Sequence, residues 1–138
     1  MTRLPFEVFV FVRRGDEYLV VHRSPGGGAY WHSIAGGVEE GESYEQAASR
    51  ELFEETGLAA EPVRVGEPFV YSLDEEPEYR DLFPDADGIA VAPFLVDVPV
   101  GWEPQLNDEH DEYRWCSRAD AVELLHWPEP KELLKTLP

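Results

Sequence analysis

Residues 36–58 read Gly36-Gly37-Val38-Glu39-Glu40-Gly41-Glu42-Ser43-Tyr44-Glu45-Gln46-Ala47-Ala48-Ser49-Arg50-Glu51-Leu52-Phe53-Glu54-Glu55-Thr56-Gly57-Leu58. On a helix, the carboxylates of Glu51, Glu54 and Glu55 share an arc of about 100°. Three like charges this close together are costly at neutral pH unless a cation lies among them. A solvated helix face is the alternative, but Ala47 and Ala48 share the face and would let another element approach closely. The pattern favours a metal site, and Mg²⁺ or Mn²⁺ suits its oxygen ligands.

The two ends of this helix are marked in the sequence. Ser43 and Gln46 have the spacing of a capping box, and Gly57 is a typical C-terminal stop. The sequence therefore predicts a helix over residues 44–56. Upstream, the glycines of the 36–41 stretch predict a turn whose peptide groups lie close to metal or phosphate, because glycine adopts backbone conformations that a side chain opposes.

The whole stretch fits the spacing G-x5-E-x7-R-E-U-x-E-E-x-G-U, in which U is aliphatic, and every fixed position is filled. In this it resembles the Nudix hydrolases, a family that cleaves nucleoside-diphosphate-linked compounds with divalent metals. The resemblance implies an α+β fold, an α-β-α sandwich around a mixed β-sheet. At 138 residues the chain is expected to form a single Nudix hydrolase domain over 1–138.

The same resemblance implies roles for individual residues. The implied metal ligands are the backbone carbonyl of Gly36 and the side chains of Glu51, Glu54, Glu55 and Glu109. Arg50 is expected to be structural and to orient the glutamates. Glu42 either pairs with Arg50 or approaches the metal, and the structural role is preferred. The expected catalytic residues are Glu54, Glu55 and Glu109.

Glu109 lies outside the glycine-to-leucine stretch, in the acidic run 107–112 that precedes a short aromatic strand. Many Nudix enzymes have a glutamate a few residues before a tryptophan-containing strand, so Glu109 is expected to be a ligand or the general base. Glu112 is the second choice. His110 either positions a phosphate or the attacking water, or has no role in the site.

Segments around this stretch have a weaker resemblance to one branch of the family, the dATP and dihydroneopterin-triphosphate pyrophosphohydrolases. Residues 30–42 are similar to that branch's F-W-Q-S-V-T-G-S-V-E-E-G-E. Trp31 either stacks on a purine or pterin ring or packs in the core. His22 and Arg23 either contact phosphate at a strand end or face solvent.

Three functions remain open from the sequence. The first is hydrolysis of a nucleoside or pterin triphosphate to monophosphate and pyrophosphate, by attack of water on phosphorus. The second is hydrolysis of another compound, such as a nucleotide sugar, ADP-ribose or a dinucleoside polyphosphate. The third is a binding domain without turnover, which the complete set of glutamates disfavours.

The composition of the chain limits which binding partners and which cellular location are expected. The net charge of −18 disfavours nucleic acid and anionic lipid, and it makes a phosphorylated small substrate compatible only with a cation. The lone cysteine, Cys116, excludes an intrachain disulfide, fits a reducing cytoplasm and suggests core packing. No apolar run reaches the ~20 residues of a membrane span. A homodimer stays open, because homodimers are common among the relatives.

Hydrophobic patterning outlines the remaining elements. Expected strands cover residues 6–13, 18–23, 31–34, 63–73, 89–96 and 113–116. A helix capped by Ser117 is expected to run to Leu125, and another from Pro130 to Leu137. The polar stretch 74–87 is expected to be a long loop.

Overall fold

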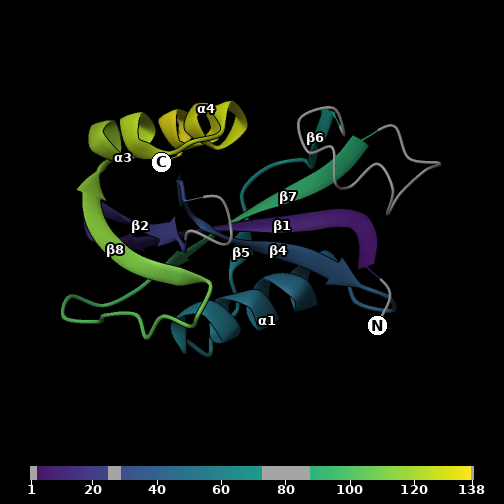
Figure 1. The fold of residues 1–138 in the computed structure, drawn as a ribbon, viewed down its shortest axis with the longest axis horizontal. Helices are drawn as coiled ribbons and strands as arrows, with labels where there is room; N and C mark the ends of the chain where they lie inside the picture. Colours follow the sequence, from purple (N-terminus) through teal and green to yellow (C-terminus); the bar gives the residue numbers. More distant parts are fainter. Residues whose placement is uncertain (1–2, 25–28, 73–87, 138) are drawn as a thin grey trace.

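A computed structural model describes residues 3–24, 29–72 and 88–137. A mixed β-sheet forms the middle layer. Helix α1 (Tyr44–Thr56) covers one face, and helices α3 (Arg118–Leu124) and α4 (Pro128–Thr136) cover the other (Figure 1). The α+β class and the α-β-α layers predicted from the sequence are confirmed. No helix in the described part of the chain is long and apolar enough to cross a membrane.

Eight strands make up the sheet in the described ranges. They are β1 (Arg3–Arg14), β2 (Glu17–Arg23), β3 (Trp31–His32), β4 (Ile34–Glu39), β5 (Val63–Arg64), β6 (Phe69–Ser72), β7 (Gly88–Asp97) and β8 (His110–Ser117). The central strand β1 pairs in parallel with β7 and antiparallel with β2 and β4. On the outer side of β2, β8 adds another antiparallel partner.

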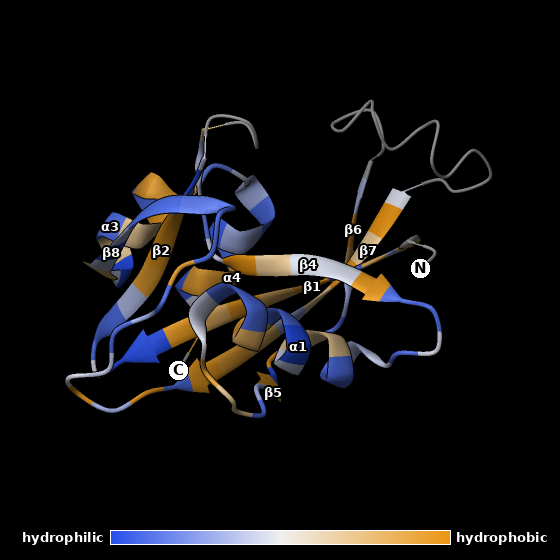
Figure 2. Ribbon diagram, turned by 60° about the horizontal axis from the view of Figure 1, so that its bottom comes forward, coloured by the Kyte–Doolittle hydropathy of each residue, from blue (hydrophilic) through white to orange (hydrophobic). Residues whose placement is uncertain are grey.

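The alternation of β1 divides the core between the two faces, because successive side chains of a strand point to opposite sides. Val8, Val10 and Val12 pack in the cluster beneath α1. Phe9 and Phe11 pack in the other cluster, with residues of α3 and α4. Figure 2 shows apolar colouring along much of the central strands.

Helix α1 has the predicted ends. Ser43 Oγ accepts a hydrogen bond from the Gln46 amide at 3.1 Å, and the Gln46 side chain accepts one from the Ser43 amide at 2.9 Å. Gly57 closes the helix in the left-handed conformation (φ 79°), where a side chain would be strained.

Three of the predicted elements differ in the structure. The paired glycines lie inside β4, and the turn comes after them at Gly41 (φ 82°). The strand expected over 63–73 is two short strands, because Gly66 and Pro68 interrupt it. The final helix begins at Pro128, since proline is well tolerated in a first helical turn. The loop expected over 74–87 lies outside the described residues.

Cys116 is buried in the cluster that α3 and α4 cover, which confirms its predicted packing role. Burial, with a smaller contribution from the charge of Asp120, raises the pKa of the thiol. A thiol with a raised pKa is a poor nucleophile, so nothing in its environment favours catalysis.

Candidate active site

Arg50 ties α1 to β4 and to the turn between them. Its Nε and Nη2 donate to the two oxygens of Glu42 at 2.8 and 3.0 Å, and Nη2 also donates to the Gly37 carbonyl at 2.8 Å. Nη1 donates to Glu51 Oε1 at 2.9 Å. The hydrogen bond from Arg50 lowers the pKa of Glu42, so both partners stay charged. Arg50 thereby holds the Glu51 carboxylate in a defined place on the helix.

Gly36 and Glu51 are in direct contact. A Cβ added to Gly36 would lie 2.1 Å from Glu51 Cδ, which no real side chain permits. The absence of a side chain on β4 therefore creates the space that the Glu51 carboxylate occupies. This close approach explains the glycine better than its torsion angles do, since its φ is not positive.

Glu55 is the most deeply buried carboxylate of the site, with 1% of the residue exposed. Burial, then the charges of Glu51 and Glu109 and a hydrogen-bonded contact with Glu51, raise its pKa well above the ordinary value, while Arg23 opposes the shift. Its Oε2 is buried and has no hydrogen-bond partner among the described residues. Such an oxygen is costly to bury unless something positive binds it.

His110 lies behind Glu55. Its side chain is fully buried, and its Nε2 lies 3.6 Å from Glu55 Oε1. Burial, helped by the charge of Arg23, lowers the pKa of His110 to about 4, so the ring is neutral at pH 7. A ring enclosed in this way contacts the glutamate and not a ligand in the cavity.

Glu54 differs from its two neighbours. Half of its side chain is exposed, and Arg50 Nη1 lies 3.3 Å from its Oε2. In the part of the chain that the structure describes, no three His, Cys, Asp or Glu side chains already form a closed metal cage. The helical wheel correctly brings the three carboxylates to one arc, but their exposure differs from residue to residue.

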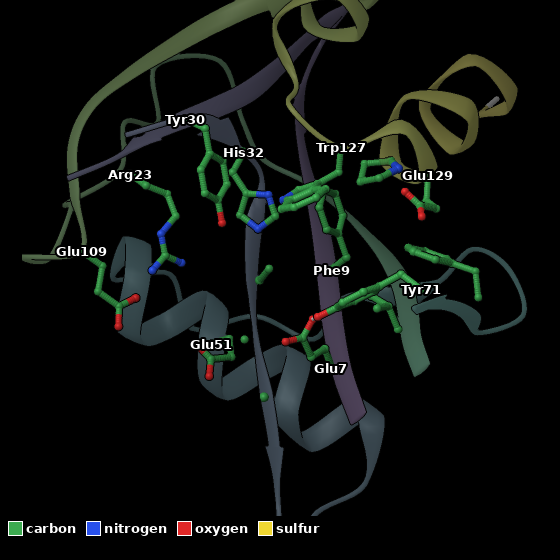
Figure 3. Close-up of a pocket in the computed structure, with 16 residues that line it drawn as sticks. Glu7, Phe9, Arg23, Tyr30, His32, Glu51, Tyr71, Glu109, Trp127 and Glu129 are labelled. Carbon is green, nitrogen blue, oxygen red and sulfur yellow. The ribbon is translucent and has the colours of Figure 1, made fainter. Parts of the chain in front are cut away.

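A cavity of about 230 Å³ opens beside these carboxylates (Figure 3). Its charged end contains Arg23, Glu51 and Glu109, and glycines 36 and 37 form part of its floor. Its other walls are mainly aromatic or acidic, with a few aliphatic residues; they are Glu7, Phe9, Tyr30, His32, Ala35, Phe69, Tyr71, Val91, Trp127, Glu129 and Pro130. A phosphate-sized charged end is thus continuous with a space suited to a flat ring.

Two of the expected substrate-binding residues lie elsewhere. Trp31 packs edge-on against His22 at 5.0 Å, and His22 Nδ1 lies 2.8 Å from Asp111 Oδ1. Neither residue lines the cavity. Tyr30 and His32 do, because they flank Trp31 in the chain and point to the opposite side. Strand alternation was the available signal, but it does not tell which face is hollow.

Arg23 does line the cavity, and its Nε is buried with no hydrogen-bond partner among the described residues. Together with burial it lowers the pKa of the neighbouring His32 to about 3. Figure 3 shows the Arg23 side chain extending between Tyr30 and Glu109. A cation in a cavity whose other charged lining residues are carboxylates is suited to an anionic group of a ligand.

The residues present fit a divalent cation. Glu55 Oε2 is a buried oxygen donor without a hydrogen-bond partner in the described part of the chain, and the Glu51 carboxylate, one turn away on α1, lies against Gly36. Hard cations such as Mg²⁺ and Mn²⁺ prefer donors of this kind.

Comparison with known proteins places the chain in a family. The NUDIX domain model matches residues 3–137, so the chain belongs to the NUDIX domain family. The NAD-capped RNA hydrolase NudC of Haemophilus influenzae is 49% identical over 61 residues, which are 41% of this chain and 23% of that protein. An octanoyltransferase of Myxococcus xanthus is 38% identical over 131 residues, 88% of this chain and 33% of that protein.

Among solved structures, the dihydroneopterin triphosphate pyrophosphohydrolase of E. coli superposes with a TM-score of 0.84. The match covers 99% of this chain and 97% of that one at 21% identity, which shows a shared fold. The chain spans about a quarter to a third of the length of the two curated relatives.

Proposed function

We propose that this chain hydrolyses a nucleoside or pterin triphosphate to the monophosphate and pyrophosphate, by attack of water on phosphorus. The observation that supports this is the continuity of one cavity. One part of it holds Arg23, Glu51 and Glu109, and the rest is walled mainly by aromatic rings, together with Glu7 and Glu129. A triphosphate attached to a flat heterocycle has the same division into a charged and a stacking part.

The cation that this reaction needs would be held by the Gly36 carbonyl and by side chains of Glu51, Glu54, Glu55 and Glu109. A divalent cation supplies charge neutralisation on the phosphates and lowers the pKa of a bound water. Arg50 is proposed to orient these carboxylates through its bonds to Glu42 and Glu51.

The chain's own groups are proposed to bind and orient the substrate. Arg23 contacts a phosphate oxygen with its guanidinium group, and Tyr30 and Trp127 stack on the ring. Glu109 is the preferred general base, because it lines the cavity and Glu55 does not. Glu54 is the alternative base. His110 is proposed to act on Glu55 and not on the substrate.

Hydrolysis of another diphosphate is the second candidate. It is favoured by the 49% identity to a protein named as an NAD-capped RNA hydrolase, over a segment that is 41% of this chain. That similarity also leaves the exclusion of nucleic acids, which rests on the charge of −18, as a prediction. Homodimer formation likewise stays a prediction.

A turnover screen in Mg²⁺ or Mn²⁺ tests the proposal. The substrates are dATP, other nucleoside triphosphates, dihydroneopterin triphosphate, ADP-ribose, NAD and a dinucleoside tetraphosphate, with products separated and oxygen-18 water used to locate the attacked phosphorus. Pyrophosphate from a triphosphate is the expected product. Turnover confined to NAD or a dinucleoside tetraphosphate would replace the first candidate by the second.

A pair of variants identifies the base. Glu109→Gln should lower kcat by about 100-fold or more, in the range typical of general-base removal. Glu112→Gln is the matched control, because Glu112 lies on β8 outside the cavity and is half exposed beside Arg114. Equal losses in the two variants would remove Glu109 from this role.

A further inference from the structure

The segment that carries Glu109 is docked on the C-terminal end of α1. The last carbonyls of any helix have no partner within the helix. Here the Gly57 amide donates to the Phe53 carbonyl at 2.8 Å, and the Gln105 amide donates to the Thr56 carbonyl at 2.9 Å. Asn107 Nδ2 donates to the Glu54 carbonyl at 3.2 Å. A distant loop therefore supplies two of the caps of the carboxylate-bearing helix.

The same asparagine holds the peptide of Glu109. Asn107 Oδ1 accepts a hydrogen bond from the Glu109 amide at 3.1 Å. From the other side, the Ser24 amide donates to the Glu109 carbonyl at 2.9 Å, and Ser24 Oγ donates to the Asp108 carbonyl at 3.0 Å. Both backbone polar groups of Glu109 are thus fixed.

The Glu109 side chain has no comparable support. Within the described residues, no hydrogen bond or ion pair holds its carboxylate. Its position in the cavity is therefore set by the backbone that carries it. Because Asn107 binds the Glu109 peptide with one side-chain atom and α1 with the other, its side chain links the Glu109 peptide to the helix of Glu51, Glu54 and Glu55, beside the contact of His110 with Glu55.

We propose that Asn107 is a positioning residue that couples Glu109 to the carboxylates of α1. Figure 1 shows the chain approaching β8 past the end of α1, as these contacts require. The inference rests on the catalytic role proposed for Glu109. Geometry of reacting groups has a steep effect on rate, and a displacement of about 1 Å can cost about 100-fold. One hydrogen-bonding side chain in a partly exposed loop has a much smaller effect on folding.

Three variants separate the two ends of the link. Asn107→Ala removes both side-chain contacts. Asn107→Asp keeps an acceptor for the Glu109 amide but removes the donor to the Glu54 carbonyl. Gln105→Ala is the control, because its exposed side chain is removed while its amide still caps Thr56. We expect kcat to fall at least 10-fold in both Asn107 variants, with KM within 3-fold of wild type, and to stay unchanged in Gln105→Ala.

A double-mutant cycle with Glu109→Gln shows whether Asn107 acts through Glu109. We expect Asn107→Ala to lower kcat less than 2-fold once Glu109 is already Gln. A loss as large as in the wild-type background, or wild-type kcat in Asn107→Ala, would overturn the proposal.

Amide hydrogen exchange gives a readout that does not depend on turnover. The Glu109 amide should exchange faster in Asn107→Ala than in wild type and Asn107→Asp. If Glu109→Gln itself retains wild-type kcat, the role proposed for Glu109 fails, and exchange alone then decides the link. Unchanged Glu109 exchange in Asn107→Ala would overturn it.

Discussion

At the scale of single residues, the three helical carboxylates have three different environments. The exposed fraction of the side chain is 12% for Glu51, 51% for Glu54 and 1% for Glu55. Burial raises the pKa of both Glu51 and Glu55; the Arg50 charge opposes the shift at Glu51, and the Arg23 charge opposes it at Glu55. Residues of one type in one helical turn are therefore unequal, because exposure is set by what packs against each of them.

A substitution at Gly36 tests the space for Glu51. Gly36→Ala should displace the Glu51 carboxylate and weaken Mn²⁺ binding by about 10-fold or more, since ligand displacement of this kind disturbs metal sites strongly. Isothermal titration calorimetry with Mn²⁺ measures the change. Gly66→Ala is the matched control, because its added Cβ would meet Pro93 Cγ at an ordinary 3.5 Å. Wild-type Mn²⁺ affinity in Gly36→Ala would show that Glu51 is not a ligand.

At the scale of elements, the two residues of β3 face different surroundings: one packs against neighbouring side chains, and the other lines the cavity. Trp31 faces His22 and lies 4.6 Å from the guanidinium carbon of Arg114, whereas His32 faces the cavity. Trp127, the N-cap residue of α4, also lines this cavity. Elements far apart in the chain thus supply the aromatic walls, and adjacent residues of one strand have different tasks.

Two tryptophan variants test this division. Trp127→Leu should raise KM for the preferred substrate by about 5-fold, because stacking on a ring contributes about 1 kcal/mol beyond area burial. Trp31→Leu should lower the melting temperature and leave KM near the wild-type value. Steady-state kinetics and thermal unfolding of both proteins check the prediction. If KM rises in Trp31→Leu and not in Trp127→Leu, the residue that stacks on the substrate ring is Trp31.

At the scale of the whole molecule, folding encloses titratable groups in a chain with a net charge of −18. His32 and His110 are held neutral, with pKa values of about 3 and about 4. Glu55 shifts in the opposite direction. Folding therefore disfavours the protonated form of these two histidines and the ionised form of Glu55. The histidines reduce the free energy of unfolding as pH falls, and Glu55 reduces it as pH rises.

The histidine contribution can be measured directly. The folded pKa of His32 is about 3 and its ordinary value is 6.5, so between these values the unfolded chain binds the extra proton. Stability from this group is therefore present above pH 6.5 and is lost as pH falls toward 3. His32→Gln should reduce the slope of unfolding free energy against pH by up to about 1.4 kcal/mol per pH unit. Metal-free urea unfolding from pH 4 to 7.5 checks this; parallel curves would contradict it.

Local patterns in the sequence were sufficient for α1 and for its charged face. Helix capping, the 3.6-residue period and the spacing of the glutamates act within about one or two turns, so they can be read without a fold. The resemblance carried by that stretch also pointed to the family and to the α-β-α layers. The predicted boundaries of strands and turns were wrong where a glycine or a proline lies in or next to the sheet, as at Gly36 and Pro68.

Only the tertiary structure decided which residues meet at the site. The choice of Tyr30 and His32 over Trp31 depends on which face of a strand is left open, and that is set by the packing of α3 and α4. The burial of His110 against Glu55 and the contact of Asn107 with the Glu54 carbonyl join residues more than 50 positions apart. Such contacts form because chain folding brings unpaired groups together, and no short-range spacing encodes them.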